Sequence, residues 1–410
     1  MLCFLDRKLY LCNQLVKNRM RNSVSEKAPL VKIAIGLMAG MVAAKYVASL
    51  PLFPLLVGLI LIAFCLWRHA YLQSAVIILC FMVLGALLMQ RAQQEPPQVS
   101  RMERSKNYFL SQRARLLDRL SENGVDGDVY AVVAAMALGD KSQLTKELKE
   151  TYAVTGAAHV LALSGLHLSI IYTLLSLLLG RRRWQVVSQV LIIICIWLFV
   201  FLVGMSASVV RSAVMLTVYA LLSLGDRNRM SVNTLAFTAI VMLIVHPLSL
   251  FDIGFQLSFL AVLAILIWYP VFEGFIPQSF LMSHPLVRWL WSLLAVSCAA
   301  QLGTAPLITY YFGRFSFLFL MTNLVVIPFA PLILYLTLAV LFVPSLAYLL
   351  VYIVSALNAI LAFVASIPWV SIEALHPSML QIIMVYVIIA AAYLLIDRLS
   401  GTFEVFRRKM

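Results

Sequence analysis

Long apolar runs separated by short polar stretches dominate the chain of 410 residues. A helix needs about 20 apolar residues to cross the hydrocarbon core of a bilayer. The pattern therefore predicts an all-α polytopic integral membrane protein with about 12 transmembrane helices, some of them broken. The candidate runs are residues 31–50, 52–67, 70–90, 157–180, 186–204, 207–224, 232–246, 253–272, 286–307, 316–343, 346–367 and 379–396.

Composition supports a membrane protein over the soluble classes. Hydrophobic residues make up 63% of the chain and charged residues 12%, with a mean hydropathy of +0.98. Soluble domains carry about 25% charged residues, so this chain has too little charge for a surface covered by water. A disordered chain and a soluble nucleotide-binding domain are excluded. A channel, a transporter and an intramembrane enzyme all remain open.

Cysteine usage points to neither a disulfide framework nor a metal site. The 6 cysteines form no C-x-x-C pair, and four of them lie inside apolar runs, where free cysteines behave as small hydrophobic residues. A cleavable signal peptide is not expected either, because the first apolar run is long and no small-residue cleavage site ends it.

Positive charge is distributed unevenly and indicates the orientation of the chain. Lysine and arginine total 31 against 17 acidic residues, a net charge of +14 that is concentrated in residues 1–120. Cytoplasmic segments of membrane proteins are enriched in lysine and arginine. We therefore predict a basic cytoplasmic N-terminus at 1–30, N-terminal spans at 31–90 and a basic cytoplasmic tail at 397–410. Anionic membrane lipids are the expected partners of these basic ends.

Residues 91–155 follow the third predicted span and should lie outside the cell as an amphipathic helical segment. Its polar helices carry an apolar stripe that includes Leu117 and Leu120, and a second amphipathic piece is expected at 142–149. Its positive charge opposes the usual bias, so either the number of spans differs by one or external positive charge has a use. The basic residues of this segment include Arg113, Arg115 and Arg119.

Polar side chains inside apolar runs are functional candidates, because they are costly in lipid unless they are paired or hydrated. The densest cluster runs from Thr155 to His167 and contains His159, Ser164 and Gly165. Its glycines predict a broken helix, which is tolerated at membrane depth only where it faces protein or a water-filled cavity. Hydrogen bonding between helices is the structural alternative for this cluster.

Three further features interrupt the later runs. Arg211 is permanently charged and needs a carboxylate, carbonyls, water or an anion, unless its side chain only reaches the membrane surface. Asp252 follows Pro247 and is placed to cap a helix, which is the more frequent role of such a carboxylate. The remaining candidates that line or bridge helices are Gln256, Ser258, Gln301 and Asn323.

At these clusters the chain resembles the ComEC competence protein family, the inner-membrane channel for DNA uptake in natural transformation. The family's histidine followed by Ser-Gly-Leu-His corresponds to His159 and Ser164–His167. Its Gly-Phe-Gln-Leu-Ser-Phe stretch corresponds to Gly254–Phe259. Weaker similarity lies at Ala137–Ser142 and in the series Gln301, Pro306, Phe312, Gly313 and Asn323, so the resemblance covers roughly residues 125–345.

The resemblance implies a competence-type channel domain at 156–396 that moves single-stranded DNA across the cell inner membrane. It implies as further partners a DNA-receptor protein, a cytoplasmic ATPase and a separate nuclease, and it allows a homo-oligomer. The nuclease domain of fuller family members is not expected here, because no His-x-His-x-Asp-His string occurs. We expect no enzymatic activity, cofactor or metal. The implied DNA pathway comprises His159, Ser164, Gly165, His167, Arg211, Asp252, Gln256, Ser258, Gln301 and Asn323. The external residues expected to gather the incoming DNA strand by charge are Arg113, Arg115 and Arg119.

Two other functions fit the same residues. A secondary transporter for a small anionic or lipid-linked solute would use the broken helix and Arg211. An intramembrane hydrolase would use Ser164 and a histidine, although Ser164 lacks a G-x-S-G setting and needs a base within hydrogen-bond reach.

Overall fold

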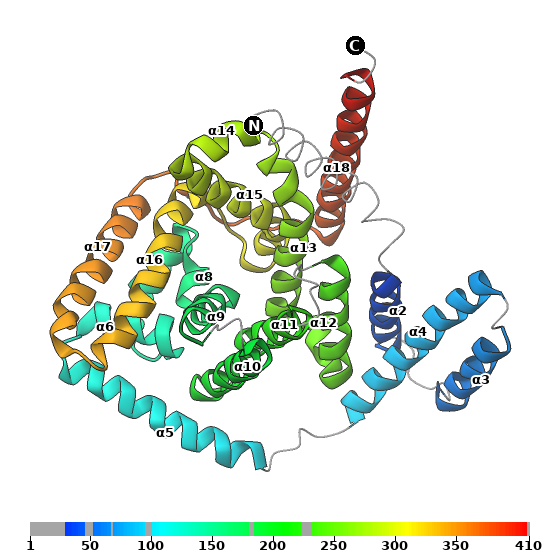
Figure 1. The fold of residues 1–410 in the computed structure, drawn as a ribbon, viewed down its shortest axis with the longest axis horizontal. Helices are drawn as coiled ribbons and strands as arrows, with labels where there is room; N and C mark the ends of the chain where they lie inside the picture. Colours follow the sequence, from blue (N-terminus) through cyan, green and yellow to red (C-terminus); the bar gives the residue numbers. More distant parts are fainter. Residues whose placement is uncertain are drawn as a thin grey trace. The chain divides into compact units, whose positions relative to one another are not determined.

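A computed structural model describes residues 29–45, 52–66, 69–94, 101–179, 184–223 and 231–407. The described chain is helical almost throughout, so it is an all-α polytopic membrane protein (Figure 1). Each of the twelve predicted runs contains a helix, and among the described residues seven helices are long and apolar enough to cross a membrane. They are α4 (Ala70–Gln94), α10 (Gln185–Leu202), α13 (Ile253–Glu273), α15 (Pro285–Phe312), α16 (Phe319–Val340), α17 (Ala347–Ala365) and α18 (Met379–Arg407).

The other predicted runs form shorter or interrupted helices. Run 157–180 is broken into α8 (Ala158–Leu161) and α9 (Gly165–Leu179), as its glycines predict. The basic termini are only partly described: residues 1–28 and 408–410 lie outside the described residues, and α18 continues well past the predicted end of its span at residue 396. The remaining short helices are α2 (Pro29–Ala44), α3 (Leu52–Cys65), α11 (Ala207–Ser223) and α12 (Val232–Val245).

The described helices form two compact units. The smaller unit contains α2, α3, α4, α12 and the short 3₁₀ helix η3 (Pro247–Phe251). Glycines allow its helices α2 and α4 to touch backbone to backbone, because a Cβ atom at Gly40 would overlap the carbonyl of Met82 and one at Gly85 the carbonyl of Leu37. Close approach through small residues is a common way for helices to associate in lipid. The helix α12 packs against α2.

The larger unit holds every helix that carries the family motifs, and its core differs from the prediction in one place. Residues 127–138 were expected among the polar helices of segment 91–155. Instead α6 (Gly127–Val133) and the π-helical turn η1 (Ala134–Leu138) pack against α16 and α17 (Figure 1). Residues 131–138 are all buried, with exposed fractions of at most 6%. The apolar sequence Ala131–Leu138 explains this burial, since it has no polar face to present to water.

Two amphipathic helices flank this buried helix. Helix α5 (Arg101–Glu122) buries Leu117 and Leu120 while Arg115 and Arg119 are exposed, as the stripe predicts. Helix α7 (Lys146–Val154) begins later than the predicted piece at 142–149, because Thr145 caps it: the Leu148 amide donates to Thr145 Oγ1 at 3.1 Å. The side of the membrane on which these helices lie stays a prediction.

A two-stranded antiparallel sheet, which we call the β clasp, joins two interhelical segments. Strand β1 (Phe315–Ser316) lies between α15 and α16, and β2 (Ser371–Ile372) lies between α17 and α18, with Phe315 opposite Ile372. Gly313 ends α15 in the left-handed conformation at φ +67°, and its carbonyl accepts a hydrogen bond from the Leu375 amide at 2.8 Å. Strands of two residues were not predicted.

Candidate functional site

A glycine precedes the broken helix formed by α8 and α9, and we call the interruption between them, residues 162–164, the break. Gly156 lies between α7 and α8 at φ +81°, a conformation that favours glycine. A Cβ atom there would lie 3.2 Å from Ser316 Cβ and 3.3 Å from Phe319 Cβ. The β clasp and the start of α16 therefore pack directly on the backbone that leads into the break.

The motif Ser-Gly-Leu-His forms a helix cap. Ser164 precedes α9 at the N-cap position, and its carbonyl accepts the first helical hydrogen bond from the Leu168 amide. His167 Nδ1 lies 3.3 Å from the Ser164 amide nitrogen, which donates to it, and 3.1 Å from Ser164 Oγ. A side chain at the third helical position that bonds back to the N-cap amide defines the capping box, usually with Glu or Gln there. Here histidine takes that place, so the predicted Ser164–His167 relationship is a direct contact.

His159 and His167 both make a hydrogen bond through Nδ1, but one donates and the other accepts. The Ser164 amide can only donate, so Nδ1 of His167 is the acceptor and a neutral ring carries its proton on Nε2. His159 Nδ1 lies 3.1 Å from the Gly156 carbonyl, which can only accept, so its Nδ1 carries the proton. His167 is 0% exposed, whereas His159 is exposed. The buried His167 is therefore left with Nε2–H as a donor, and the exposed His159 is left with Nε2 as an acceptor.

Arg211 lies on α11 and is buried, with 4% of its surface exposed, so its side chain does not simply reach the membrane surface. Its Nη2 donates to Ser258 Oγ on α13 at 3.3 Å. A Cβ atom at Gly254 would lie 2.8 Å from the same nitrogen, so the guanidinium occupies a notch made by glycine. The neighbouring Ser212 Oγ would lie 3.2 Å from a Cβ atom at Gly165. Arg211 and Ser212 therefore join the two motifs, which lie far apart in the sequence.

The motif Gly254–Phe259 on α13 also forms a hydrogen bond with α15. The Tyr311 hydroxyl donates to Gln256 Oε1 at 2.8 Å, which fixes the amide between the two helices. Asp252 is exposed and directly precedes α13 with an extended backbone (φ −76°, ψ +123°), the position and conformation of an N-cap residue. Phe255 is buried and packs on Phe259 with ring centroids 4.3 Å apart.

Other predicted site residues lie apart from the break. Gln301 is half-buried on α15, and Asn323 lies in the second turn of α16 with a buried Oδ1. No hydrogen bond among the described residues links either side chain to α8 or α9. On α5, Arg115 and Arg119 are exposed, whereas Arg113 is half-buried and its Nη1 would lie 3.9 Å from a Cβ atom at Gly204. These three arginines do not form one exposed face.

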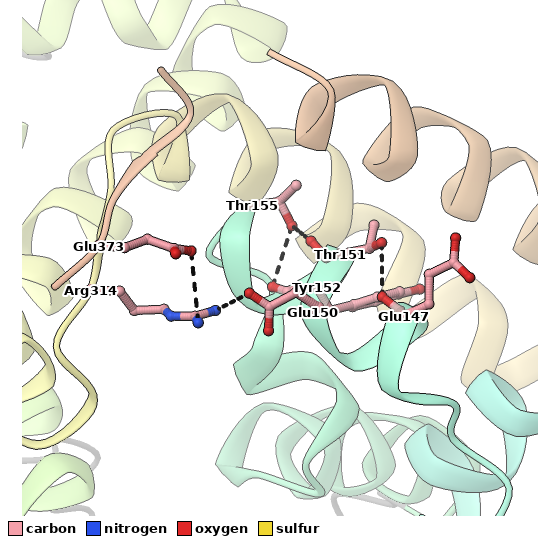
Figure 2. A network of polar contacts seen from close by, with 7 residues as sticks. All are labelled: Glu147, Glu150, Thr151, Tyr152, Thr155, Arg314 and Glu373. Carbon is pink, nitrogen blue, oxygen red and sulfur yellow. Dashed lines mark hydrogen bonds and ion pairs between the residues drawn. The ribbon is translucent and has the colours of Figure 1, made fainter. Parts of the chain in front are cut away.

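An ion-pair network around Arg314 was missed by sequence reasoning. Figure 2 shows Arg314 between Glu150 on α7 and Glu373 beside β2. Its Nη1 lies 2.8 Å from Glu150 Oε1, and its Nη2 lies 3.8 Å from Glu373 Oε1. Arg314 is a single charge in a short loop, so no periodicity or motif marked it. The network connects α7, which leads into the break, with the β clasp.

The same helix α7 is anchored from its inner face. The Tyr152 hydroxyl donates to Asn358 Oδ1 on α17 at 2.8 Å, and Tyr152 is fully buried. Burial raises the pKa of the Tyr152 phenol, because the charged form would lose its hydration. Thr155 Oγ1 donates to the Thr151 carbonyl at 2.8 Å and closes the C-terminal turn of the helix.

Comparison with known proteins identifies the family. The model of the family described as "Competence protein" matches residues 136–399, a range that includes both motifs and more than half of the chain. The chain belongs to this Competence protein family. The predicted ComEC resemblance is confirmed, and the match extends further toward the C-terminus than the predicted 125–345.

Curated relatives share the matched region but are longer. ComE operon protein 3 of Bacillus subtilis (strain 168) is 29% identical over 235 residues, which are 56% of this chain and 28% of that protein. An uncharacterized protein of Aquifex aeolicus (strain VF5) is 33% identical over 53% of this chain and 48% of its own length. Recombination protein 2 of Haemophilus influenzae is 23% identical over 53% of this chain and 29% of its own length. The matched region spans less than half of each relative, and no solved structure matches the chain.

Proposed function

We propose that this protein is a channel component of the cell inner membrane that passes single-stranded DNA into the cytoplasm during natural transformation. The observation that carries the proposal is the meeting of the two Competence motifs at Arg211 and Ser212. The family description "Competence protein" and the name of one relative, Recombination protein 2, fit a role with DNA. Single-stranded DNA, anionic lipids, a DNA receptor, a cytoplasmic ATPase and a separate nuclease are the partners that such a role requires, and a homo-oligomer is compatible with it.

The chemistry of the site suits a polyanion in transit. A DNA strand that crosses the membrane carries about one negative charge per nucleotide. Each charge must stay hydrated, or protein groups must replace its water. The N-terminus of α9 carries free backbone N–H groups and the positive end of the helix dipole, and Gly165 at this end is exposed. Arg211 supplies one fixed charge, and the histidines and Ser164 supply neutral hydrogen-bonding groups. A single fixed charge attracts a phosphate without holding the strand permanently.

A transformation assay tests this function. The gene is deleted from its own organism, or expressed in a naturally competent bacterium that lacks its Competence-family protein, and entry of labelled DNA is measured beside the frequency of transformants. We expect uptake to be lost on deletion and restored by the intact chain. Normal uptake in the deletion strain would contradict the proposal.

A secondary transporter for a small anionic or lipid-linked solute is the second candidate. Broken helices whose N-termini point at an anionic substrate are typical of transporters, and α9 begins at such an interruption. Purified protein in liposomes separates the two: a transporter saturates with its solute and ignores DNA, whereas the channel admits single-stranded oligonucleotides.

An intramembrane hydrolase is not favoured by the geometry. Ser164 Oγ lies 3.1 Å from His167 Nδ1, within reach of a general base. However, the Ser164 amide also donates to the lone pair of Nδ1, and no described residue accepts a hydrogen bond from Nε2 to orient the ring as a third triad member does. The contact is explained by the helix cap.

A further inference from the structure

We propose that the two ring nitrogens of His167 have separate roles: Nδ1 caps α9, and the Nε2–H group donates a hydrogen bond to a phosphodiester oxygen of the passing strand. This inference rests on the proposed function, since it names the group of the strand that the break receives. Its argument begins with the cap, because the cap fixes the orientation of the ring.

The contact with Ser164 uses Nδ1 of His167 as a hydrogen-bond acceptor. It lies within hydrogen-bond distance of both the amide nitrogen and the hydroxyl of Ser164, so the imidazole is held against the start of α9 from one edge. Since the amide can only donate, the cap requires an unprotonated Nδ1. A neutral His167 therefore presents Nε2–H from the opposite edge of the ring.

The Nε2–H group has no acceptor among the described residues, although His167 is 0% exposed. A buried donor without a partner is destabilising. Capping alone does not explain this arrangement, because a glutamate at the same position would accept from the Ser164 amide and leave no donor behind. Compared with glutamate, histidine therefore adds an oriented donor, Nε2–H, to the cap.

The first turn of α9, which carries His167, suits an incoming anion. Side chains in the first turn of a helix lean toward its N-terminus, where the N–H groups of Gly165 and Leu166 have no carbonyl within α9. Gly165 is exposed, so this end of α9 is open on one side while the imidazole is covered. The segments around the break must part for a phosphodiester oxygen to reach Nε2. The acceptor comes from water in the resting protein and from phosphodiester oxygen during transit.

Substitution by asparagine separates the two nitrogens. In His167→Asn the amide oxygen occupies the place of Nδ1 and retains the cap, whereas nothing replaces Nε2. We expect normal protein abundance and uptake per molecule lower by about tenfold or more, as expected for a lost hydrogen bond to a charged group. His167→Leu removes both groups and should reduce abundance as well. Thr173→Ala is the matched control on α9, because this exposed hydroxyl only bonds back to the Ser169 carbonyl, at 2.7 Å.

Wild-type uptake per molecule in His167→Asn would overturn the donor role. Loss of His167→Asn protein to the level of His167→Leu would overturn the cap. If His167→Asn and His167→Leu both take up DNA normally while Arg211→Gln does not, the inference fails and the proposed channel stands. Normal uptake after deletion of the whole gene is the separate failure of the proposed function.

Nitrogen NMR gives a readout that does not depend on uptake. Purified full-length protein labelled with ¹⁵N-histidine should show a His167 ring with bare Nδ1 and protonated Nε2, assigned by its loss in His167→Asn. Adding a single-stranded oligonucleotide should shift the Nε2 resonance, whereas inorganic phosphate at the same charge concentration should not. The opposite tautomer, or an Nε2 resonance that does not respond to the oligonucleotide, would overturn the proposal and leave water as the acceptor.

Discussion

The guanidinium of Arg211 lies so close to the backbone of Gly254 that a Cβ atom there would be 2.8 Å from Nη2. Ser258, one helical turn later on the same face of α13, accepts a hydrogen bond from that nitrogen. The spacing of glycine and serine in Gly254–Phe259 thus has a physical reason: the glycine makes room for an arginine from another helix and the serine binds it.

Gly254→Ala should therefore displace Arg211. The added methyl group must push the guanidinium away or separate α11 from α13, and overpacking of this kind costs about 1–3 kcal/mol. We expect lower thermal stability in detergent and reduced DNA uptake. Gly58→Ala on α3 is the control, because no atom lies within 4 Å of a Cβ atom there. If Gly254→Ala and Gly58→Ala have the same thermal stability and DNA uptake, the close fit of Arg211 against Gly254 is unimportant.

Arg211→Gln tests whether the buried charge meets phosphate. Each phosphate contact on a single strand contributes about 0.7 to the slope of log affinity against log salt concentration. Binding of an oligonucleotide to the purified variant, measured over a salt series, should lose about that amount from its slope. Arg288→Gln is the control, because Arg288 is exposed and lies at the opposite end of α15 from Tyr311. An unchanged slope accompanied by lower stability would mean that Arg211 serves only to hold helices together.

Glu150→Gln should loosen the tie between α7 and the β clasp. Exposed ion pairs contribute about 0.2–1 kcal/mol, and salt weakens them. Both partners of the 2.8 Å contact are partly exposed, 29% for Arg314 and 56% for Glu150. A double-mutant cycle with Arg314→Gln should give a coupling free energy in that range at low salt and almost none at high salt. Glu147→Gln is the control on the same helix, since its carboxylate makes no ion pair with a described residue. Coupling that persists at high salt would contradict a surface network.

The sequence predicted the helices well and their packing poorly. All twelve apolar runs contain helices because burial in lipid depends on composition, which is local. The burial of Ala131–Leu138 was missed because the flanking polar residues dominated the interpretation of segment 91–155. The β clasp and the Arg314 network are formed by segments far apart in the chain, and two-residue strands leave no periodicity to detect.

The candidate site was predicted in part for the same reason. Ser164 and His167 are three residues apart and were expected to share a helix face, and they do contact. The notch of Gly254 and Arg211 depends on how α11 meets α13, which no local pattern encodes. Gln301 and Asn323 were grouped with the site because they are polar, and no described hydrogen bond joins them to the break.

The purified protein should not cleave DNA with any divalent metal. No group of three or more His, Cys, Asp or Glu side chains within the described ranges could hold a metal ion. Labelled single- and double-stranded DNA incubated with magnesium, manganese or zinc should remain intact. Cleavage that needs metal and stays with the protein through repeated purification would contradict this expectation.

The last prediction concerns His159, whose role differs from that of His167 because its ring is exposed. Its Nδ1–H donates to the Gly156 carbonyl at 3.1 Å, so Nε2 remains as the hydrogen-bond acceptor of this exposed ring. In His159→Leu the side chain keeps a similar size, and we expect uptake per molecule to fall while abundance stays nearly normal. In His159→Asn the amide can replace Nδ1–H, which preserves the bond to Gly156 and removes Nε2.

Comparing the two variants, by immunoblot for abundance and by transformation frequency for uptake, separates structure from pathway. If His159 only stabilises the turn at Gly156, then His159→Asn restores what His159→Leu loses, and uptake follows the amount of protein. If Nε2 belongs to the strand path, both variants lose uptake at normal abundance. Normal uptake per molecule in both would remove His159 from the pathway.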